Sequence, residues 1–312
     1  MYDSIIILGP TASGKTTLSI ELAKLLNAEI VNADSMYIYK DLNIGTAKPT
    51  LDEMNGIKHH LISFVNPEDS MNVSIYRENA EQIINDLHNK NILPIIVGGT
   101  GFYIDSLITT NSYGETEKNE LLRKELEDEF DKVGGFELHK KLESLDKESA
   151  DKIHYNDKFR LIRSLEMALT GNIKSQIINF EKPILENPLI FGLNIPRDIL
   201  YSRINSRVDS MIENGLVDEV KNLIDLGLNP TSHQCMKGIG YKEIYSYLNN
   251  EISLDESIEK IKQHTRNYAK RQITWFKRNN NIIWLDGLLD KNILIEKILN
   301  QFNNTEIKNK NC

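Results

Sequence analysis

Residues 4–26 read SIIILGPTASGKTTLSIELAKLL, and this stretch decides the fold that we expect. Its first five residues form a short apolar run typical of a buried strand, and Leu18, Leu22 and Leu25 repeat at helical spacing. Residues 9–16 between them match the pattern G-x-x-x-x-G-K-[ST] in full. In that pattern the backbone N–H groups and the lysine surround a phosphate, and the last hydroxyl can bind Mg²⁺. The stretch therefore predicts a strand, a phosphate-binding loop and a helix.

The rest of the chain extends this unit into a sheet. Further apolar runs typical of strands lie at 28–32, 59–63 and 92–99, and a helical pattern at 74–88 precedes the last of them. Strands that alternate with helices predict a parallel sheet whose ligand lies at the carboxyl ends of the strands. Strand patterns return at 188–195 and 281–285.

A region without strand patterns interrupts this core. Residues 113–187 show apolar residues at helical spacing, and no strand is evident there. We expect an α/β fold, with a P-loop NTPase-like parallel sheet core flanked by helices and an all-helical insert domain. The core would comprise residues 1–112 and 188–312, including helices toward the C-terminus, and the insert would comprise residues 113–187.

The composition argues against several classes of protein. With 37 Lys and Arg against 45 Asp and Glu, the net charge of −8 is not that of a wholly basic nucleic-acid binder. No apolar stretch has the length of a membrane span, and the N-terminus lacks the pattern of a signal peptide, so we expect a cytoplasmic protein. The two cysteines, Cys235 and Cys312, indicate neither a disulfide framework nor a zinc site.

Two segments that follow predicted strands supply polar groups at the expected ligand edge. Asp34 follows the strand at 28–32, where its carboxylate can organise Mg²⁺, take a proton from an acceptor, or only cap a turn. Thr100 follows the strand at 92–99, where many NTPases carry an aspartate that helps to hold Mg²⁺. The absence of that aspartate argues against motor and switch NTPases and leaves small-molecule kinases open.

Several short segments become specific when they are taken together. The chain contains, in the order seen in bacterial tRNA dimethylallyltransferases, the segments GPTASGKT, DSMYIY, IGTAKPT, HHLI, VGGTGFY, RINSRVDSM, GIGYKE and TRNYAKRQITWF. It resembles that family from residue 4 to about residue 285. The resemblance implies transfer of a dimethylallyl group from dimethylallyl diphosphate to N6 of the adenosine 3′-adjacent to the anticodon, position 37 of the tRNA.

The resemblance also implies the products, the substrates and a cofactor. The products would be N6-isopentenyladenosine and diphosphate, and the tRNAs would be those that read codons beginning with U. No phosphoryl group would be transferred, because the phosphate-binding loop would hold the leaving group. Mg²⁺ would be the cofactor, with Thr16 as a ligand.

The reacting groups are likewise implied by the resemblance. Asp34 would accept the proton of the adenine amine, and Thr100 would lie beside that amine or the diphosphate. Arg203 and Arg207 are four residues apart and share one helix face, and we favour Arg207 for catalysis. The diphosphate would be bound by Gly9, Pro10, Thr11, Ala12, Ser13, Gly14, Lys15, Thr16 and Arg203.

Contacts with tRNA follow from the same resemblance. The pocket for the flipped adenine would be lined by Asp34, Ser35, Met36, Tyr37 and Thr100, and the insert would contact tRNA through Arg123, Phe159, Arg160 and Arg163. At Tyr37 and at Phe159 the chain departs from the family, which commonly has glutamine there. An aromatic ring in place of an amide can stack on a base or pack in the core.

The segment 260–278 indicates nucleic-acid contact independently of the resemblance. It holds seven Lys and Arg and no acidic residue. On a helix Arg266, Lys270, Thr274 and Lys277 lie along one stripe, with Lys262 one turn earlier. Such a stripe can follow a phosphate backbone. We therefore predict that tRNA contacts Arg266, Lys270, Arg271 and Lys277.

Three other functions are consistent with parts of the sequence. An enzyme that prenylates free adenine nucleotides would share the same site, but the long helical insert and the basic helix are more than a mononucleotide requires. A P-loop kinase for a nucleoside or small molecule would use Asp34 as the base for an acceptor hydroxyl and would transfer the γ-phosphoryl group of ATP. A nucleic-acid-binding protein regulated by nucleotide would explain the basic segment but not the Asp34 and Thr100 segments. If the main hypothesis is right, the partners are dimethylallyl diphosphate and tRNA, which would bind through its anticodon stem-loop. We expect the protein to be a monomer that does not associate with a membrane and needs no obligate protein partner.

Overall fold

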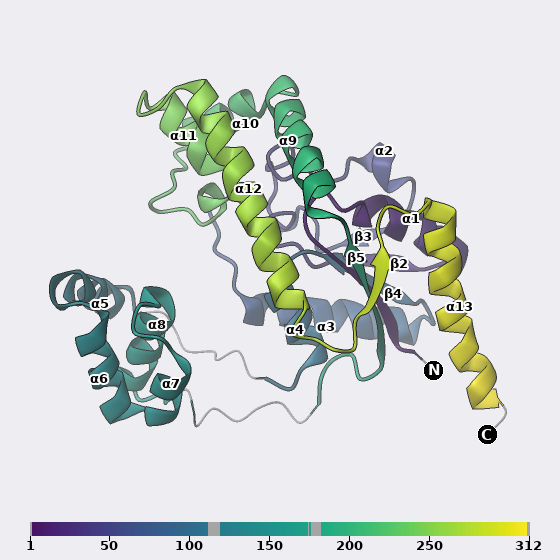
Figure 1. The fold of residues 1–312 in the computed structure, drawn as a ribbon, viewed down its shortest axis with the longest axis horizontal. Helices are drawn as coiled ribbons and strands as arrows, with labels where there is room; N and C mark the ends of the chain where they lie inside the picture. Colours follow the sequence, from purple (N-terminus) through teal and green to yellow (C-terminus); the bar gives the residue numbers. More distant parts are fainter. Residues whose placement is uncertain (1, 112–118, 174, 176–181, 311–312) are drawn as a thin grey trace. The chain divides into compact units, whose positions relative to one another are not determined.

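The computed structural model describes residues 2–111, 119–173, 175 and 182–310 (Figure 1). The chain forms two compact units, of which the first comprises Met1–Thr109 and Pro183–Cys312 and the second Thr110–Lys182. The sequence placed the ends of the insert at 113 and 187, and the first of these lies outside the described residues. No helix within the described residues combines the length and apolar character needed to cross a membrane.

Unit 1 is built on a sheet that, within the described residues, has six strands in the order β3-β2-β4-β1-β5-β6. All neighbouring strands are parallel. The strands are β1 (Ser4–Leu8), β2 (Glu29–Asn32), β3 (His59–His60), β4 (Pro94–Gly98), β5 (Pro188–Asn194) and β6 (Ile283–Asp286). The predicted parallel α/β core is therefore confirmed.

One predicted strand is much shorter than the sequence suggested. Of the apolar run at 59–63, only His59–His60 pairs with β2. Leu61 and Ser63 have φ angles of 57° and 50°, in the left-handed region. Strand backbone requires negative φ, so the strand ends before Leu61.

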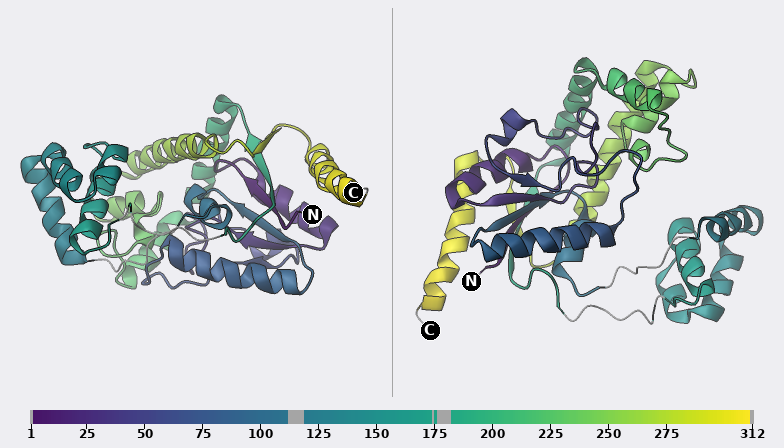
Figure 2. Two further views of the ribbon diagram at one scale, coloured as in Figure 1. Left: turned by 90° about the horizontal axis from the view of Figure 1, so that it is seen from below. Right: turned by 180° about the vertical axis from the view of Figure 1, so that it is seen from behind.

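Helices cover both faces of the sheet. On one face, α1 (Lys15–Leu26) and α13 (Lys291–Lys310) pack on a core that includes Ile5, Ile7 and Ile95. Since successive strand residues point to opposite faces, Ile6 and Ile96 face the other side, which α3 (Val73–Asn89) and α4 (Gly101–Ile108) cover (Figure 2). The rings of Tyr76 and Tyr103 stack at 3.9 Å where α3 meets α4.

A group of helices after β5 completes unit 1. They are α9 (Arg197–Glu213), α10 (Leu216–Asp225), the 3₁₀ turn η2 (Cys235–Lys237), α11 (Tyr241–Leu248) and α12 (Leu254–Phe276), and the short α2 (Leu51–Met54) lies earlier in the chain. Helix α12 begins after Ser253, whose side chain caps it by accepting the Glu256 N–H. Ala269 of α12 packs on Leu200 and Ile204 of α9, so the two helices lie side by side (Figure 1).

The secondary structure of unit 2, within its described residues, consists of helices, as the sequence predicted. It contains α5 (Glu120–Val133), α6 (Gly135–Leu145), α7 (Lys147–Lys152) and α8 (Lys158–Leu169). Leu126, Leu138, Leu142, Leu161 and Leu165 form its core and are each no more than 1% exposed. These leucines come from α5, α6 and α8, so the helical spacing seen in the sequence is the spacing of this core.

Candidate active site

Three loops meet at the carboxyl ends of β1, β2 and β4. They are the phosphate-binding loop after Leu8, the segment with Asp34 after Asn32, and the segment with Thr100 after Gly98. Strand β4 lies between β1 and β2 and pairs with both, so its loop is flanked by the other two. This is the edge at which parallel sheets bind ligands.

The phosphate-binding loop is closed around the Lys15 side chain. Its ammonium group donates hydrogen bonds to Gly9 O at 2.9 Å and to Pro10 O at 2.8 Å. Gly14, with φ at +89°, turns the chain into α1 through a conformation that side chains disfavour. Burial lowers the pKa of Lys15 to about 8; the Asp34 carboxylate opposes this shift and Arg207 adds to it. A phosphate in this loop would supply the anion that the buried amine lacks.

Asp34 is held in place by its own turn and by Asn32. Its Oδ1 accepts the Met36 N–H at 2.9 Å, which is an Asx turn, and its backbone N–H donates to Asn32 Oδ1 at 3.0 Å. Burial raises the pKa of Asp34, against hydrogen bonds from Met36 and Tyr37 and the positive charges of Lys15 and Arg207. The Asx turn is compatible with the predicted role of Asp34, because a carboxylate with a raised pKa beside a phosphate-binding loop can accept a proton.

The Thr100 segment is fastened to the Asp34 segment. Thr100 N–H donates to Ala33 O at 3.1 Å, and its hydroxyl oxygen accepts the Ser35 N–H at 3.0 Å. A Cβ at Gly98 would lie 2.1 Å from Ala33 O, so only glycine allows this approach. The structure therefore brings together Asp34 and Thr100, which sequence reasoning placed in one site.

Arg207 reaches the phosphate-binding loop from α9. Its Nη1 donates to Thr11 Oγ1 at 3.4 Å, and its charge lowers the pKa of Asp34. Arg203, one turn earlier on the same helix, is exposed. The geometry thus favours Arg207 for contact with a bound diphosphate, while the role of Arg203 stays a prediction.

The inner face of α12 contributes side chains that the sequence did not single out as site residues. Gln272 donates to Gly99 O and accepts the Thr11 N–H, and Tyr268, one turn earlier, is hydrogen-bonded to the Thr100 and Gln272 side chains. Trp275 Nε1 donates to Asp105 Oδ2 at 2.9 Å, and this bond holds the half-buried indole ring in place. The only available signal was the spacing of Tyr268 and Gln272 by four residues, which places them on one helix face.

The segment after Asp34 rests on residues that lie far away in the sequence. Tyr37 donates its hydroxyl to Ala47 O at 2.8 Å. The carboxylate of Glu219 accepts the N–H groups of three consecutive residues, 43–45, and the Tyr241 hydroxyl. A Cβ at Gly45 would lie 2.7 Å from the Tyr241 ring. The segments IGTAKPT and GIGYKE therefore share one packing contact.

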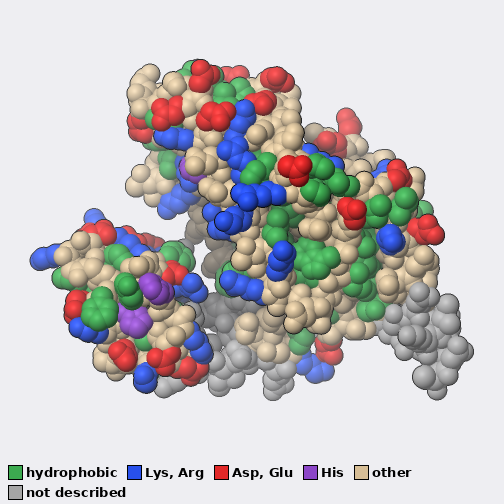
Figure 3. Space-filling view, in the orientation of Figure 1, with side chains coloured by type: hydrophobic (Ala, Val, Ile, Leu, Met, Phe, Trp, Pro, Cys, Tyr) green, Lys and Arg blue, Asp and Glu red, His purple; other side chains and the backbone are tan. Residues whose placement is uncertain are grey.

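The predicted basic stripe on α12 is divided between structural and exposed residues. Lys262 pairs with Asp209 at 2.7 Å, and Arg266 donates to Asn205 Oδ1 at 2.7 Å, so both bind α9. Lys270, Arg271 and Lys277 are exposed, and basic side chains gather along this helix (Figure 3). An open groove on this face is lined by Asn267, Lys270, Arg271, Thr274, Trp275 and Arg278.

In unit 2, the residues predicted to contact tRNA differ in how far they are bound by other side chains of the protein. Glu166, 1% exposed, accepts from Arg123 at 2.6 Å and from Arg163 at 2.9 Å, and these bonds lower its pKa against the effect of its burial. Arg160 pairs with Asp157 at 2.5 Å. Phe159 is 79% exposed, so it does not pack in the core. Contact of these residues with tRNA stays a prediction.

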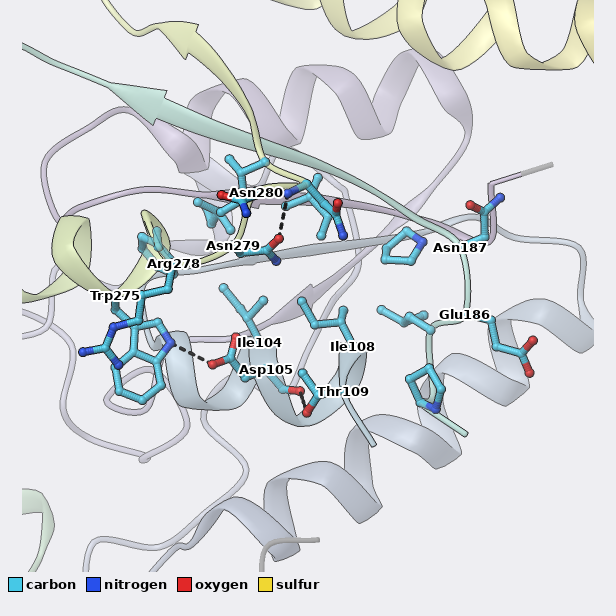
Figure 4. Close-up of a pocket in the computed structure, with 18 residues that line it drawn as sticks. Ile104, Asp105, Ile108, Thr109, Glu186, Asn187, Trp275, Arg278, Asn279 and Asn280 are labelled. Carbon is cyan, nitrogen blue, oxygen red and sulfur yellow. Dashed lines mark hydrogen bonds between the residues drawn. The ribbon is translucent and has the colours of Figure 1, made fainter. Parts of the chain in front are cut away.

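A cavity of about 700 Å³ lies away from the three loops, between α4, the segment 183–188 and the C-terminal end of α12. Figure 4 shows Trp275 and Asp105 on one side of it and Asn279 and Asn280 on another. Its lining includes Leu8 but none of Lys15, Asp34 and Thr100. The cavity is therefore separate from the candidate active site.

A metal ion at the active site would depend on the substrate for ligands. Within the described residues there is no group of three or more His, Cys, Asp or Glu that could hold a metal. Mg²⁺ prefers oxygen ligands and commonly uses one or two protein groups together with substrate phosphates. The half-buried hydroxyl of Thr16, at the start of α1, is an oxygen donor of this kind. The residues present therefore fit a Mg²⁺ ion that arrives with a diphosphate.

Comparisons with known proteins agree with this geometry. The family described as IPP transferase matches residues 37–279. The tRNA dimethylallyltransferase of Acetivibrio thermocellus is 46% identical over 92% of both chains, and that of Clostridioides difficile is 46% identical over 95% of both.

Solved structures give the same result. The tRNA isopentenylpyrophosphate transferase of Bacillus halodurans superposes with a TM-score of 0.74 at 40% identity, covering 98% of this chain and 97% of that one. A eukaryotic dimethylallyltransferase described as acting on tRNA superposes with a TM-score of 0.76 at 32% identity, covering 91% and 73%. The chain therefore belongs to the IPP transferase family.

Proposed function

We propose that this chain transfers a dimethylallyl group from dimethylallyl diphosphate to N6 of the adenosine 3′-adjacent to the anticodon, position 37, of tRNAs that read codons beginning with U. The observation that supports this most is the meeting of Lys15, Asp34 and Thr100 at the ends of neighbouring strands. A phosphate-binding loop and a carboxylate with a raised pKa are the two parts that this reaction requires. Since its substrate would be tRNA, we propose that the enzyme acts in the cytoplasm.

In this reaction one bond at C1 of the dimethylallyl group breaks and one forms, and a proton moves from N6 to Asp34. The bond between C1 of the dimethylallyl group and the diphosphate oxygen breaks, and C1 forms a bond with N6 of the adenine. Negative charge develops on the departing diphosphate, where the loop N–H groups, Lys15 and Arg207 would stabilise it. The proton of N6 passes to the carboxylate of Asp34, which removes positive charge from the nitrogen as it attacks.

Mg²⁺ fits this proposal as an ion that Thr16 and the phosphate oxygens of the donor would hold. When bound, it would neutralise part of the charge on the leaving diphosphate. The protein groups then have two separate tasks. Lys15 and Arg207 bind and orient the diphosphate, and Asp34 and Thr100 face the acceptor amine.

A direct assay tests the proposed function. The purified protein is incubated with labelled dimethylallyl diphosphate and unmodified tRNA, and in a parallel reaction with γ-labelled ATP. We expect label to enter tRNA from the prenyl donor and none to be transferred from ATP. A tRNA whose adenosine at position 37 is replaced by guanosine is the matched control and should stay unlabelled. Transfer from ATP alone would identify a kinase instead.

The dependence of the reaction on pH follows from the raised pKa of Asp34 and the lowered pKa of Lys15. Asp34 must be ionised to accept a proton, so activity should fall as the pH drops through its raised pKa. Lys15 must be protonated to bind diphosphate, so kcat/KM for the donor should fall as the pH rises above about 8. A bound diphosphate favours the charged lysine, so the basic limb of kcat should lie at higher pH.

Initial rates at low and at saturating donor, measured across the pH range, separate these limbs. The Lys15→Arg variant is the control, because arginine stays charged and should lose the basic limb near pH 8. A basic limb at the same pH in kcat and in kcat/KM would contradict the assignment to Lys15.

A further inference from the structure

We infer that Gln272 is a positioning residue for prenyl transfer, which sets the separation between the loop that holds the diphosphate and the segment that faces the acceptor. The inference rests on the proposed function, because only a two-substrate reaction at these loops gives the separation a chemical meaning. Gln272 lies on α12, far from both loops in the sequence, and is 4% exposed.

Both ends of the Gln272 amide are used, one on each loop. Oε1 accepts the N–H of Thr11 in the phosphate-binding loop at 3.0 Å, and Nε2 donates to the carbonyl of Gly99 at 2.8 Å. A backbone N–H requires an acceptor and a backbone carbonyl requires a donor, so the amide has one possible orientation here. The amide offers a neutral donor and a neutral acceptor from one planar group, so it can bind both loops at once.

The fit of Gln272 between the loops is tight. A Cβ at Gly99 would lie 2.2 Å from Nε2 of Gln272 and 3.5 Å from the carbonyl oxygen of Gly9. Gly99 is thus close to the phosphate-binding loop and to the amide at once. The next residue is Thr100, whose hydroxyl binds the Asp34 segment through Ser35. A shift of Gln272 would therefore move the acceptor side relative to the donor side.

Helix α12 is itself anchored on both sides of Gln272. Tyr268 is hydrogen-bonded to the side chains of Thr100 and Gln272, and burial raises its pKa to about 12. On the other side, a Cβ at Gly101 would lie 2.2 Å from the Trp275 ring, which binds Asp105. Gln272 therefore stands on a rigid support, as a side chain that aligns two loops must.

The size of the expected effect follows from the geometry of group transfer. Reacting atoms must approach to about 3–3.5 Å, and a displacement of about 1 Å can cost about 10²-fold in rate. Loss of the amide leaves the Thr11 N–H and the Gly99 carbonyl to separate or to admit water. Lys15, which would bind the diphosphate, hydrogen-bonds to Gly9 O and Pro10 O and to neither of these two groups. Affinity for the donor should therefore change much less than the rate of transfer.

The first test compares Gln272→Leu with Gln263→Leu, a matched change at an exposed glutamine of the same helix. Single-turnover transfer is measured with dimethylallyl diphosphate and tRNA both saturating, and donor affinity is measured by equilibrium binding. We expect Gln272→Leu to slow transfer by about 10–100-fold with donor affinity within about threefold, and Gln263→Leu to match the wild type. An unchanged rate, or a loss of affinity as large as the loss of rate, would overturn the inference.

The second test needs no comparison of folding stability between variants. In Gln272→Glu, a carboxylate still accepts the Thr11 N–H but repels the Gly99 carbonyl, whereas a protonated carboxyl group restores the donor. The charged or titratable groups around residue 272 are the same in the variant and in the wild type; they are Lys15, Asp34, Arg207, Tyr268 and Arg271. We therefore measure the ratio of variant to wild-type transfer rate between about pH 8 and about pH 6.

This ratio should rise as the pH falls if the amide donor positions Gly99, and a flat ratio would overturn the inference. The wild-type protein is measured in every series. If it transfers no prenyl group to tRNA, the proposed function fails; if it does and the Gln272 variants follow it, only the positioning role fails.

Discussion

Replacing Asp34 by asparagine should slow prenyl transfer to tRNA by about 10²–10⁴-fold, the usual contribution of a general base. Asparagine keeps the oxygen that accepts the Met36 N–H, so the turn at residues 34–36 should stay intact. It cannot take a proton, and N6 of adenine is a weak nucleophile because its lone pair is delocalised into the ring. The loss should therefore fall on kcat, with affinity for the prenyl donor close to that of the wild type.

Single-turnover kinetics and equilibrium binding of dimethylallyl diphosphate measure these two quantities separately. Asp86→Asn, at an exposed position of α3, is the matched control and should be fully active. If donor affinity falls in proportion to the rate, Asp34 serves the metal or the diphosphate and not the acceptor amine.

Replacing Lys15 by methionine should lower kcat/KM for the prenyl donor by about 10²–10³-fold, the typical cost of removing one group that stabilises developing negative charge. Lys15 is the side chain that reaches across the loop to Gly9 O and Pro10 O, and it lies in the field of Asp34 and Arg207. Methionine has similar length and no charge, so it fills the same space but removes the cation and its two hydrogen bonds to the loop. Because the lysine would contact the diphosphate before and during bond cleavage, both KM and kcat should change.

The control for this variant is Lys24→Met, at an exposed lysine in the last turn of the same helix. Steady-state kinetics at several donor concentrations give KM and kcat for each protein. A Lys15→Met enzyme within about threefold of the wild type would show that the diphosphate binds elsewhere.

Most of the fold was predictable because its signals are local. A strand, a phosphate-binding loop and a helix follow each other within residues 4–26, and each is specified by residues that are neighbours in the chain. The parallel sheet followed from the alternation of strands and helices, and it placed Asp34 and Thr100 at one edge. The helical nature of the insert followed from the spacing of its leucines.

The predicted features that differed depended on single backbone or side-chain conformations. The apolar run at 59–63 has the composition of a strand, but left-handed conformations at Leu61 and Ser63 end β3 after two residues. Lys262 and Arg266 belong to a basic stripe in the sequence, and the structure shows that each also binds a side chain of α9, while the contact of Arg266 with tRNA stays a prediction. Charge spacing shows which side chains share a helix face and not what packs against that face.

By itself, the sequence determined the α/β core, the helical insert, the phosphate-binding loop and the position of Asp34 and Thr100 at the ends of strands, since periodicity and contiguous motifs encode each of these. Only the tertiary structure decided which distant residues hold the site together: Gln272 between two loops, Glu219 beneath residues 43–45, and Arg207 in place of Arg203 beside Thr11. The physical reason is that a hydrogen bond from one side chain to a remote backbone group has no period and no spacing. It exists only when the packing of the intervening elements brings donor and acceptor to within about 3 Å.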